Sequence, residues 1–315
     1  MTYQRSFSGY QNGRYGIYNL PGQTSNNLIT QMSLNDNKGT EDVIWGVVFG
    51  GGYKLNNSNS LGFTFLRNQS ATSTTRFLNG VKGSDDPDDI FETRSLRFLQ
   101  RSLTTTQIRG DHDFKKIEIK WQSSYSMSTQ DEPDLRYFTN RIEPGGEADI
   151  KTSDNPPSRF YREMKQNNFS NRIDFKIPFK KESSFKFGLT HLNKSRSFRE
   201  NRYVMTEVGV VYFDGNPSNY FSESNLINYD TDNLSTYDNG IVAQIGIDSA
   251  NNYNAFQTVI GAYTMVDLFI TDRIKLVSGI RLEKTNISLY LPISFLVLDR
   301  KSTRLNSSHL VISYA

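Results

Sequence analysis

The chain has 315 residues, a mean hydropathy of −0.57 and a formal net charge of +3, and only 36% of its residues are hydrophobic although 21 are Phe and 17 are Tyr. A sequence this polar is poorly suited to a soluble core of such size, so its apolar side chains must be placed by pattern. It contains no cysteine, which excludes disulfides and thiolate metal sites. It also contains no run of about eighteen apolar residues, which excludes a candidate transmembrane helix.

Residues 1–40 carry scattered aromatic side chains among Gly, Asn and Gln, with a break at Pro21-Gly22. This composition predicts a poorly defined region of strand and loop. The first residues, MTYQR, lack the basic start and apolar core of a signal peptide. If the protein is exported, we therefore expect its natural N-terminus to lie upstream.

Alternation with a period of two becomes clear from Val43 and predicts about eight long antiparallel strands, which begin near residues 43, 61, 93, 117, 169, 185, 254 and 274. The pattern is cleanest between residues 117 and 127, where Ile, Trp, Tyr and Met alternate with Lys, Glu, Gln and Ser. One face of such a strand is apolar and the other is polar or charged. The wall of a water-filled barrel in a bilayer needs this division.

The expected turns and links alternate in length. Short turns are predicted at residues 56–59, 110–113, 180–183 and 271–273, and longer links at residues 78–90, 130–159 and 202–252. Long structureless links are uncommon in compact soluble domains, whereas outer-membrane barrels have short turns at one rim and long loops at the other. The sequence therefore predicts a transmembrane antiparallel β-barrel.

The last hairpin, residues 254–290, carries a family resemblance. Each of its strands is about fifteen residues long, more than the five or six usual in soluble sheets and enough to cross a bilayer. The segment resembles a hairpin of TonB-dependent outer-membrane receptors, in which a strand of the pattern lxxGxRxExt follows a short turn. Gly279, Arg281, Glu283 and Thr285 hold those places here, and the resemblance extends over residues 40–290.

The resemblance implies a receptor in the cell outer membrane that binds a scarce nutrient of the siderophore, cobalamin or glycan class. Such a receptor imports its ligand with energy from the TonB complex, which acts through a plug domain. Complete barrels of this kind have about 22 strands, so we expect a middle fragment whose partial sheet stays open with two unpaired edges. Lipid is then one partner, and no catalytic motif, cofactor site or nucleic-acid partner is predicted.

Three regions are assigned on this basis: residues 1–40 to the poorly defined N-terminal part of the barrel, 41–298 to the barrel segment, and 299–315 to a non-native tail. Residues 299–309 read DRKSTRLNSSH, which resembles a translated sequencing adapter. The tail holds three basic residues and one acidic residue, so the remainder has a net charge of +1. The nominal pI of 8.8 therefore gives no support for nucleic-acid binding.

Five charged residues are candidates for contact with a ligand or plug. Arg196, Arg199 and Arg202 lie where the sixth predicted strand meets the longest link, and guanidinium groups there would capture an anionic ligand. Arg281 and Glu283 alternate onto the water-filled side of the last hairpin. The competing interpretation is structural, namely surface solvation for the three arginines and an ion pair in the barrel wall for Arg281 and Glu283.

Other candidate sites carry less chemistry. The acidic run at residues 85–89 and the pair Asp230 and Asp232 offer oxygen ligands for calcium, but they lack the spacing of an EF-hand, and a solvated loop is the competing interpretation. His112 and His191 have no neighbouring set of catalytic or metal-binding residues in the sequence. Loop tyrosines would stack on a sugar or aromatic ligand, or would only stabilise their loop: Tyr203, Tyr212, Tyr220 and Tyr229.

Two other functions fit the same alternation. A passive porin-like channel of the outer membrane would share the amphipathic strands and the long loops. A secreted β-rich protein that binds glycans or acts as an adhesin would share the strands but not the exposed apolar face. The sequence favours the receptor because of its last hairpin.

Overall fold

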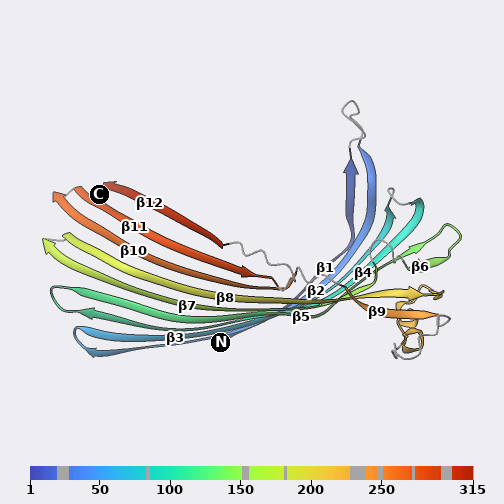
Figure 1. Cartoon of the computed structure of the whole chain (residues 1–315), viewed down its shortest axis with the longest axis horizontal. Coiled ribbons are helices and arrows are strands. Elements are labelled where there is room, and N and C mark those ends of the chain that lie inside the picture. The colour runs from blue at the N-terminus through green and yellow to red at the C-terminus, as the bar shows by residue number, and fades with distance from the viewer. Residues whose placement is uncertain are drawn as a thin grey trace.

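The computed structural model describes residues 1–19, 28–82, 86–150, 156–180, 183–227, 239–246, 251–271, 274–291 and 300–314. The fold is all-β, as the alternation predicts, with one antiparallel sheet and two short helical turns (Figure 1). No described helix has the length and apolar character needed to cross a bilayer. The elements in chain order are β1 (Thr2–Asn19), β2 (Ile29–Asn56), β3 (Asn59–Lys82), β4 (Asp86–Asp113), β5 (Glu118–Ile142), β6 (Ala148–Ile150), β7 (Ser158–Lys180), β8 (Ser183–Val208), α1 (Pro217–Tyr220), η1 (Glu223–Asn225), β9 (Gly240–Gly246), β10 (Tyr253–Thr271), β11 (Ile274–Tyr290) and β12 (Arg300–Tyr314).

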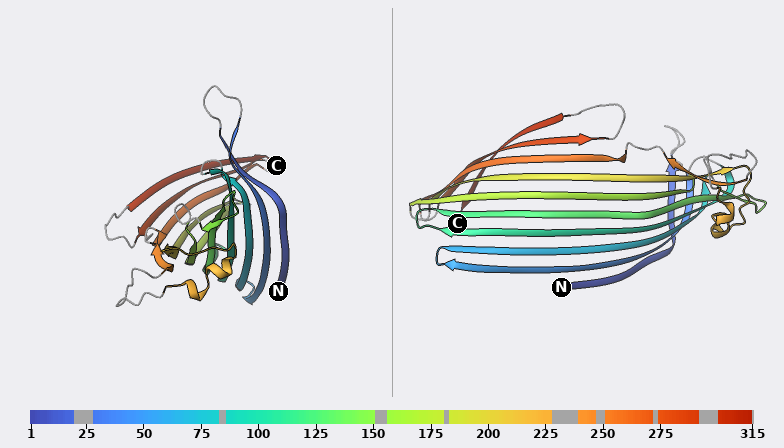
Figure 2. Two further views of the ribbon diagram at one scale, coloured as in Figure 1. Left: turned by 90° about the vertical axis from the view of Figure 1, so that its right-hand side faces the viewer. Right: turned by 60° about the horizontal axis from the view of Figure 1, so that its bottom comes forward.

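The sheet is curved and open. Its order follows the chain as β1-β2-β3-β4-β5-β7-β8-β10-β11-β12, with the short β6 paired to β5 and the short β9 paired to β8. Within the described residues, β1 pairs with β2 alone and β12 with β11 alone, so the sheet has two free edges (Figure 2). The predicted open, partial sheet is confirmed.

All eight predicted strands are present, as β2, β3, β4, β5, β7, β8, β10 and β11, and β1 adds a strand within the region expected to be poorly defined. Six of the eight run well beyond their apolar pattern. β2 has 28 residues, which at about 3.3 Å each span roughly 90 Å, about three times the hydrocarbon thickness of a bilayer. The hydrogen-bonded ladder therefore continues far outside any membrane-sized band.

The predicted long links are corrected in length. The link at residues 78–90 is strand up to Lys82 and again from Asp86, and the link at 130–159 is strand up to Ile142 and again from Ser158. Pro133 fits into β5 because a bulge separates Glu132 from Leu135, where a missing N–H costs no ladder bond. Alternation appears in the sequence only where one face of a strand is apolar and the other is polar. It therefore ends where the faces no longer differ, even though the strand continues.

Short turns gather at one end of the sheet, as Figure 2 shows. The predicted turn at 56–59 is confirmed, since residues 57 and 58 join β2 to β3. The turn expected at 110–113 lies further on, at 114–117, where Lys115 has a φ of 65° and donates its N–H to Asp113 Oδ1 at 3.0 Å. Residues 181–182 and 272–273 lie outside the described residues. We call this the short-turn end and the opposite end the long-link end.

The strand register divides the side chains between two faces, because directly paired residues share a face. In the half of the sheet next to the short turns, apolar residues occupy every second position along the strands and therefore lie on one face. We call it the apolar face, and Ile280 on it is 59% exposed. Its members include Trp45, Phe49, Tyr53, Leu61, Phe63, Phe65, Ile108, Ile119, Trp121, Tyr125, Met127, Phe169, Ile173, Phe175, Phe185, Phe187, Leu189, Phe256, Ile260, Ile280 and Leu282.

The opposite face, the polar face, carries most of the charged side chains of the strands. Buried strand residues also gather there, among them Leu34, Asp36, Phe91, Leu99, Glu132, Glu200 and Asp267. Side chains crowd together on the inner side of a curved sheet and spread apart on the outer side. The polar face is therefore the concave one, and the apolar face looks outward.

Candidate functional site

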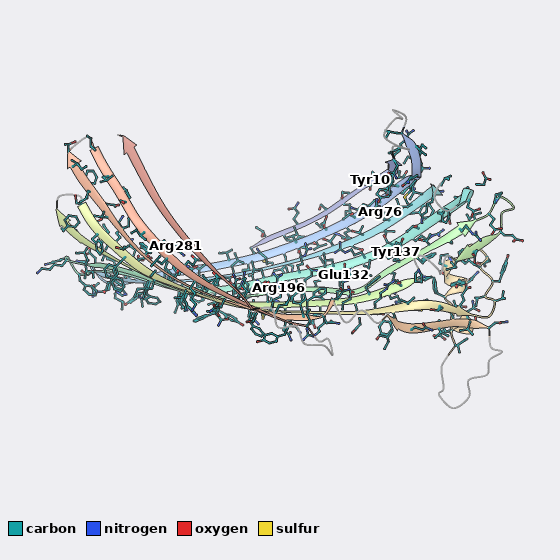
Figure 3. The ribbon with its side chains drawn as sticks, turned by 45° about the horizontal axis from the view of Figure 1, so that its top comes forward. Tyr10, Arg76, Glu132, Tyr137, Arg196 and Arg281 are labelled. Atoms are coloured by element: carbon teal, nitrogen blue, oxygen red, sulfur yellow. The ribbon has the colours of Figure 1, made fainter. Side chains whose placement is uncertain are left out.

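The five charged residues predicted as contacts lie on two strands. Arg196, Arg199 and Arg202 belong to β8, and Arg281 and Glu283 belong to β11. The register puts Arg199 on the apolar face and the other four on the polar face. Arg281 is level with Gly188 of β8, eight residues from Arg196, so the fold does not bring the two sets together (Figure 3).

The first two arginines bond to neighbouring strands. Arg196 donates from Nε and Nη2 to Gln166 Oε1 at 2.8 and 2.5 Å. Arg199 donates to the backbone oxygen of Tyr253 and to Asn254 Oδ1, both at 3.0 Å. These contacts join β8 to β7 and β10. The predicted position at a strand-to-loop junction is corrected, because β8 continues to Val208.

The remaining three predicted contacts are also engaged. Arg202 lies 5.3 Å from the ring centre of Phe160 and donates from Nη2 to Ser158 Oγ at 3.3 Å. Arg281 and Glu283 form an ion pair of 2.8 Å between half-exposed side chains. This geometry is the one expected if the two residues form an ion pair within the barrel wall.

A charge ladder that the sequence did not reveal crosses four strands on the polar face. Glu132 of β5 bonds to Arg97 of β4 and accepts from Arg162 Nη1 at 3.0 Å, and Arg162 of β7 in turn bonds to Glu200 of β8. Asn251 donates to the second oxygen of Glu200 at 2.5 Å. Glu132 is only 1% exposed. Each buried carboxylate therefore lies between donors, which is the condition for burying charge.

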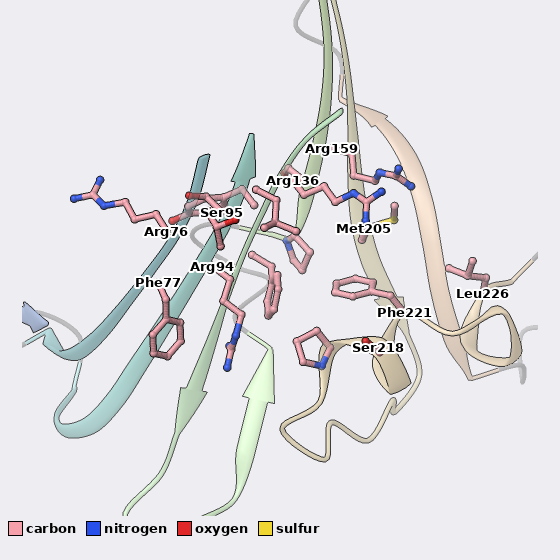
Figure 4. A pocket seen from close by; sticks show the side chains of 17 residues that line it. Arg76, Phe77, Arg94, Ser95, Arg136, Arg159, Met205, Ser218, Phe221 and Leu226 are labelled. Atoms are coloured by element: carbon pink, nitrogen blue, oxygen red, sulfur yellow. The ribbon is translucent and has the colours of Figure 1, made fainter. Parts of the chain in front are cut away.

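A cavity of about 700 Å³ lies at the long-link end. This size suits a small molecule, since ligand sites usually measure about 300–1,000 Å³. Strand residues line one side and the segment around α1 lines the other (Figure 4). Arginine and aromatic side chains dominate the lining, which includes Arg76, Phe77, Arg94, Arg136, Phe138, Arg159, Met205, Ser218 and Phe221.

The four arginines at the cavity pair with three carboxylates. Arg76 lies 2.7 Å from Asp36 and Arg94 lies 2.8 Å from Glu92, while the other two share Asp134. Arg159 donates to both oxygens of Asp134 at 2.9 and 2.6 Å, and Arg136 bonds to the same carboxylate at 2.7 Å. In this part of β5, beyond the apolar band, the bonds from Arg159 and then Arg136 hold the pKa of Asp134 below its usual range. Arg94 lies over the rings of Phe77 and Phe138, at 4.9 and 5.4 Å. The lining can therefore hold an anionic group beside a flat apolar one.

A small core holds the α1 segment over this part of the sheet. Tyr220 is 2% exposed and packs with Phe213, Ile150 and Ile241. Its hydroxyl donates to Glu207 near the end of β8. Burial, and then the bond to Glu207, raises the pKa of Tyr220, while burial raises the pKa of Glu207 itself. The segment is therefore attached by apolar packing, by the bond from Ile227 N–H to the backbone oxygen of Ile241 at 2.9 Å, and by a hydrogen bond to a poorly solvated carboxyl group.

The sequence offered only a partial signal for this site. Tyr220 and Tyr203 were among the loop tyrosines, and Tyr220 stabilises its own segment while Tyr203 packs edge-on against Tyr161 of β7. The cavity arginines come from four strands whose pairing the sequence did not specify. The register places Arg94 and Arg136 on one face, whereas Arg76 points to the opposite face, where it pairs with Asp36 at 2.7 Å.

The proposed calcium ligands do not form a site within the described residues, where no cluster of three or more acidic or His side chains could hold a metal ion. Asp89 is buried and lies 3.4 Å from Arg141. Asp85, Asp230, Asp232 and Tyr229 lie outside the described residues. His112 bonds to Asn59 and Trp121, a network described further below.

No protein-family model and no curated protein matches the chain. Among solved structures it is similar to the siderophore receptor PiuA from Acinetobacter baumannii (11% identity, TM-score 0.34), to the ferric-catecholate import receptor Fiu from K12 E. coli in its closed form (10%, 0.35), and to BauA, the ferric preacinetobactin receptor from A. baumannii (12%, 0.33). These alignments cover 88%, 89% and 88% of this chain. They cover 44%, 45% and 43% of the other chains, so this chain spans less than half their length.

Proposed function

We propose that this chain is a membrane-spanning segment of an outer-membrane transport receptor. Its apolar face contacts lipid, its polar face lines a water-filled interior, and its long-link end binds a small-molecule or glycan ligand outside the cell. Energy for import comes from the TonB complex through a plug domain, and residues 41–298 form the barrel segment. The proposal names transport, and no enzymatic step is part of it.

One observation carries the membrane assignment. Ile260 and Ile280 are 56% and 59% exposed on the apolar face, and no described helix or second sheet covers them. In water, an uncovered apolar surface of this extent costs free energy in proportion to its area. Strands with an apolar outer face and a polar inner face are stable where hydrocarbon lies on one side and water on the other.

The cavity supports the receptor part of the proposal. Its arginines and aromatic rings match a ligand with an anionic group and a flat apolar body. Arg136 is the most exposed of its paired arginines, with 56% of the side chain accessible, and it shares Asp134 with Arg159. Isothermal titration of the chain with a ferric catecholate should therefore give weaker binding for Arg136→Gln. A neutral oligosaccharide that binds in its place would favour the glycan class.

The predicted contacts on β8 and β11 are retained as part of the proposal. Arg196 and Arg281 face the interior, where they can meet a plug or a passing ligand once their neighbours release them. Arg202 and Glu283 share that face, while Arg199 contributes to the join between β8 and β10. Binding to a separately expressed plug domain should weaken on substitution of Arg281 if the contact forms.

Cysteine labelling tests the membrane assignment directly, because the chain has no native cysteine. Ile280→Cys places a thiol on the apolar face, and Arg281→Cys places one on the adjacent, polar-face position. In lipid vesicles, a water-soluble maleimide should label the second at least tenfold faster than the first. Equal labelling of both would contradict the proposal, since the two side chains are similarly exposed in the isolated chain.

The tail at residues 299–315 is proposed to be non-native. β12 pairs along β11, but an unpaired strand edge accepts many extended segments, so this pairing is compatible with an unrelated sequence. Sequencing of the genomic template decides the matter. A template that encodes DRKSTRLNSSH would refute the assignment.

A further inference from the structure

A hollow of about 480 Å³ interrupts the apolar face near the short-turn end. Its lining is almost entirely apolar and comes from four adjacent strands, β2 to β5. The lining residues on the apolar face are Gly51, Tyr53, Leu61, Phe63, Ile108 and Trp121. Large apolar side chains occupy nearby positions of this face, among them Phe49, Phe65 and Ile119, so the hollow needs a local cause.

Two glycines create the hollow. Gly51 occupies an apolar-face position, and a Cβ built on it has no atom within 4 Å, so the space beside it is open. Gly110, on the same face of β4, lies directly beneath the indole of Trp121, where a Cβ would come within 2.4 Å of the ring nitrogen. Glycine at 110 therefore lets the indole lie flat against the sheet, and glycine at 51 leaves the floor of the hollow bare.

A hydrogen-bond chain fixes the indole and leads to the rim. Trp121 donates from Nε1 to His112 Nε2 at 3.0 Å, and His112 Nδ1 lies 2.6 Å from Asn59 Oδ1. Since Nε2 accepts, the ring proton of this histidine lies on Nδ1 and is donated to Asn59. The ring of Phe114 stacks on His112 with 6.1 Å between centres. The apolar part of Trp121 thus faces the hollow while its N–H is turned toward the short turns.

Two lysines lie in the turn that follows these contacts. Lys115 and Lys116 follow Phe114 in the turn, and both are exposed. The bond from Lys115 N–H to Asp113 Oδ1 holds the turn in shape. Around the turn, Asp111 pairs with Lys120 at 3.8 Å and Glu118 pairs with Lys176 at 2.7 Å. Among the described residues of the turn, Lys115 and Lys116 are then offset by Asp113 alone, so the rim keeps a net positive charge. The described lining of the hollow has no charged side chain on the apolar face, and Arg109 of the lining points to the polar face.

We propose that this hollow is a binding site for one anionic phospholipid, with an acyl chain along Gly51 and Trp121 and the phosphate beside Lys115 and Lys116. The inference rests on the proposed membrane function and specifies which lipid the barrel wall selects. A phospholipid fits because it joins a long apolar chain to an anionic group at the membrane surface. The hollow and its rim offer the matching pair, an apolar lining beside two lysines. A second copy of the chain or an apolar peptide would match the hollow but not the cationic rim.

Tryptophan fluorescence tests the proposal, because the protein has only Trp45 and Trp121. With Trp45→Phe, emission reports on the hollow alone. At the same mole fraction in vesicles, brominated phosphatidylglycerol should quench Trp121 more strongly than brominated phosphatidylcholine does. The relative binding constant should favour the anionic lipid by about fivefold for each lysine that contributes. Lys115→Gln with Lys116→Gln should remove the preference for the anionic lipid while quenching persists.

Gly51→Leu should fill the hollow and abolish the preference. Gly39→Leu is the matched control, since Gly39 lies on the same strand and the same face and also has no atom within 4 Å of a built Cβ, but is remote from the hollow. It should leave the preference unchanged. Equal quenching by the two lipids in the parent protein, or an unchanged preference in Gly51→Leu, would overturn the lipid site.

The same experiment separates failure of the membrane assignment from failure of the lipid site. If no brominated lipid quenches either tryptophan, the protein does not enter the bilayer, and the proposed function fails together with the site. If quenching occurs without lipid preference, the membrane function stands and the site fails. Native mass spectrometry provides a second measurement without the Trp45 substitution: the parent chain should retain one phosphatidylglycerol on release from detergent, and Gly51→Leu should retain none.

Discussion

The two ends of the sheet treat apolar side chains in opposite ways. Near the short turns, Ile260, Ile280 and Leu282 stay 56–59% exposed on a continuous outward face. At the long-link end, Tyr220 and Ile241 are covered by a small core that the α1 segment completes. One chain with one hydrogen-bonded ladder thus builds a small core at one end, although Val210, Tyr212 and Ile245 beside it stay exposed, and leaves a continuous apolar face uncovered at the other. Under the proposed function this difference is expected, because lipid surrounds one end of the strands and water surrounds the other.

Charged groups follow the same division. At the long-link end the ladder from Arg97 to Glu200 compensates its buried carboxylates within the sheet, and Arg136 and Arg159 share Asp134. Near the short turns most of the charge lies on the polar face, where Lys186 pairs with Asp267 at 2.7 Å. Lys284, paired with Ile260, and Arg67, paired with Val47, lie on the apolar face. The apolar face has no such pairs in the band next to the short turns, as far as the described residues extend. Substitutions that place a charge on the apolar face, or remove one from the buried ladder, should therefore have the largest effects on stability.

The largest effect is expected for a charge on the apolar face. Leu189→Arg should destabilise the membrane-inserted protein by about 2–4 kcal/mol, because Leu189 lies between Ile173 and Ala262 on the apolar face and an arginine there must leave water or distort the lipid. Thr190→Arg is the matched control, since Thr190 is the adjacent residue of β8 and points to the polar face. Guanidinium unfolding in vesicles compares the two variants. Equal losses would remove the distinction between the faces.

The next effect concerns the buried ladder at the other end. Glu132→Gln leaves Arg97 and Arg162 close together without their shared counter-charge. We expect a loss of about 2 kcal/mol, less than for a fully buried pair because the side chain of Arg97 is 45% exposed. Glu163→Gln on β7 removes an exposed carboxylate paired with Lys165 and should cost less than about 0.5 kcal/mol. Chemical unfolding curves would refute the role of the ladder if the two variants behaved alike.

A pH dependence should distinguish the long-link end further. Burial raises the pKa of Glu207 above its ordinary value of 4.5, so the docked α1 segment binds a proton more tightly than the undocked one. Docking should therefore be strongest below pH 4.5 and weaken as the pH rises through the raised pKa. A spin label on Ser224→Cys, the only cysteine of that variant, should become more mobile over this window. Glu207→Gln should make its mobility independent of pH, and a label that responds to pH in that variant as well would contradict the assignment.

The comparison also explains how much of the fold the sequence could predict. Near the short turns the solvent differs between the two faces, so residues 117–127 and 169–177 alternate strictly and their strands were predicted. At the long-link end the two faces no longer divide into apolar and polar, since Phe138 packs against the α1 core on the same face as Arg136. The sequence from 130 to 142 therefore loses its alternation although β5 continues through it. Strand pairing supplies the hydrogen bonds in both regions, but only burial leaves a pattern in the sequence.

The candidate site was harder to predict for a related reason. Arg281 and Glu283 were assigned to the polar face, and the register agrees, because two residues on one alternating strand determine it. Arg94, Arg136 and Arg159 were not selected, since their proximity depends on the pairing of β4 with β5 and of β5 with β7, including the bulge after Glu132. That bulge reverses which face each later residue of β5 occupies, and nothing but Pro133 marks it in the sequence.

The smallest effect is expected for the ion pair on β11, which both interpretations of Arg281 address. Arg281 and Glu283 are about 40% exposed, so removal of one partner in Glu283→Gln should change stability by less than about 1 kcal/mol. The sharper measurement is binding to a plug domain or ligand at two salt concentrations. If Arg281 makes a contact across the interior, Arg281→Gln weakens binding at low salt several times more than Glu283→Gln does, because only the first removes a charge that the partner meets. If the pair serves the wall alone, the two variants change binding equally and their small effects are confined to unfolding.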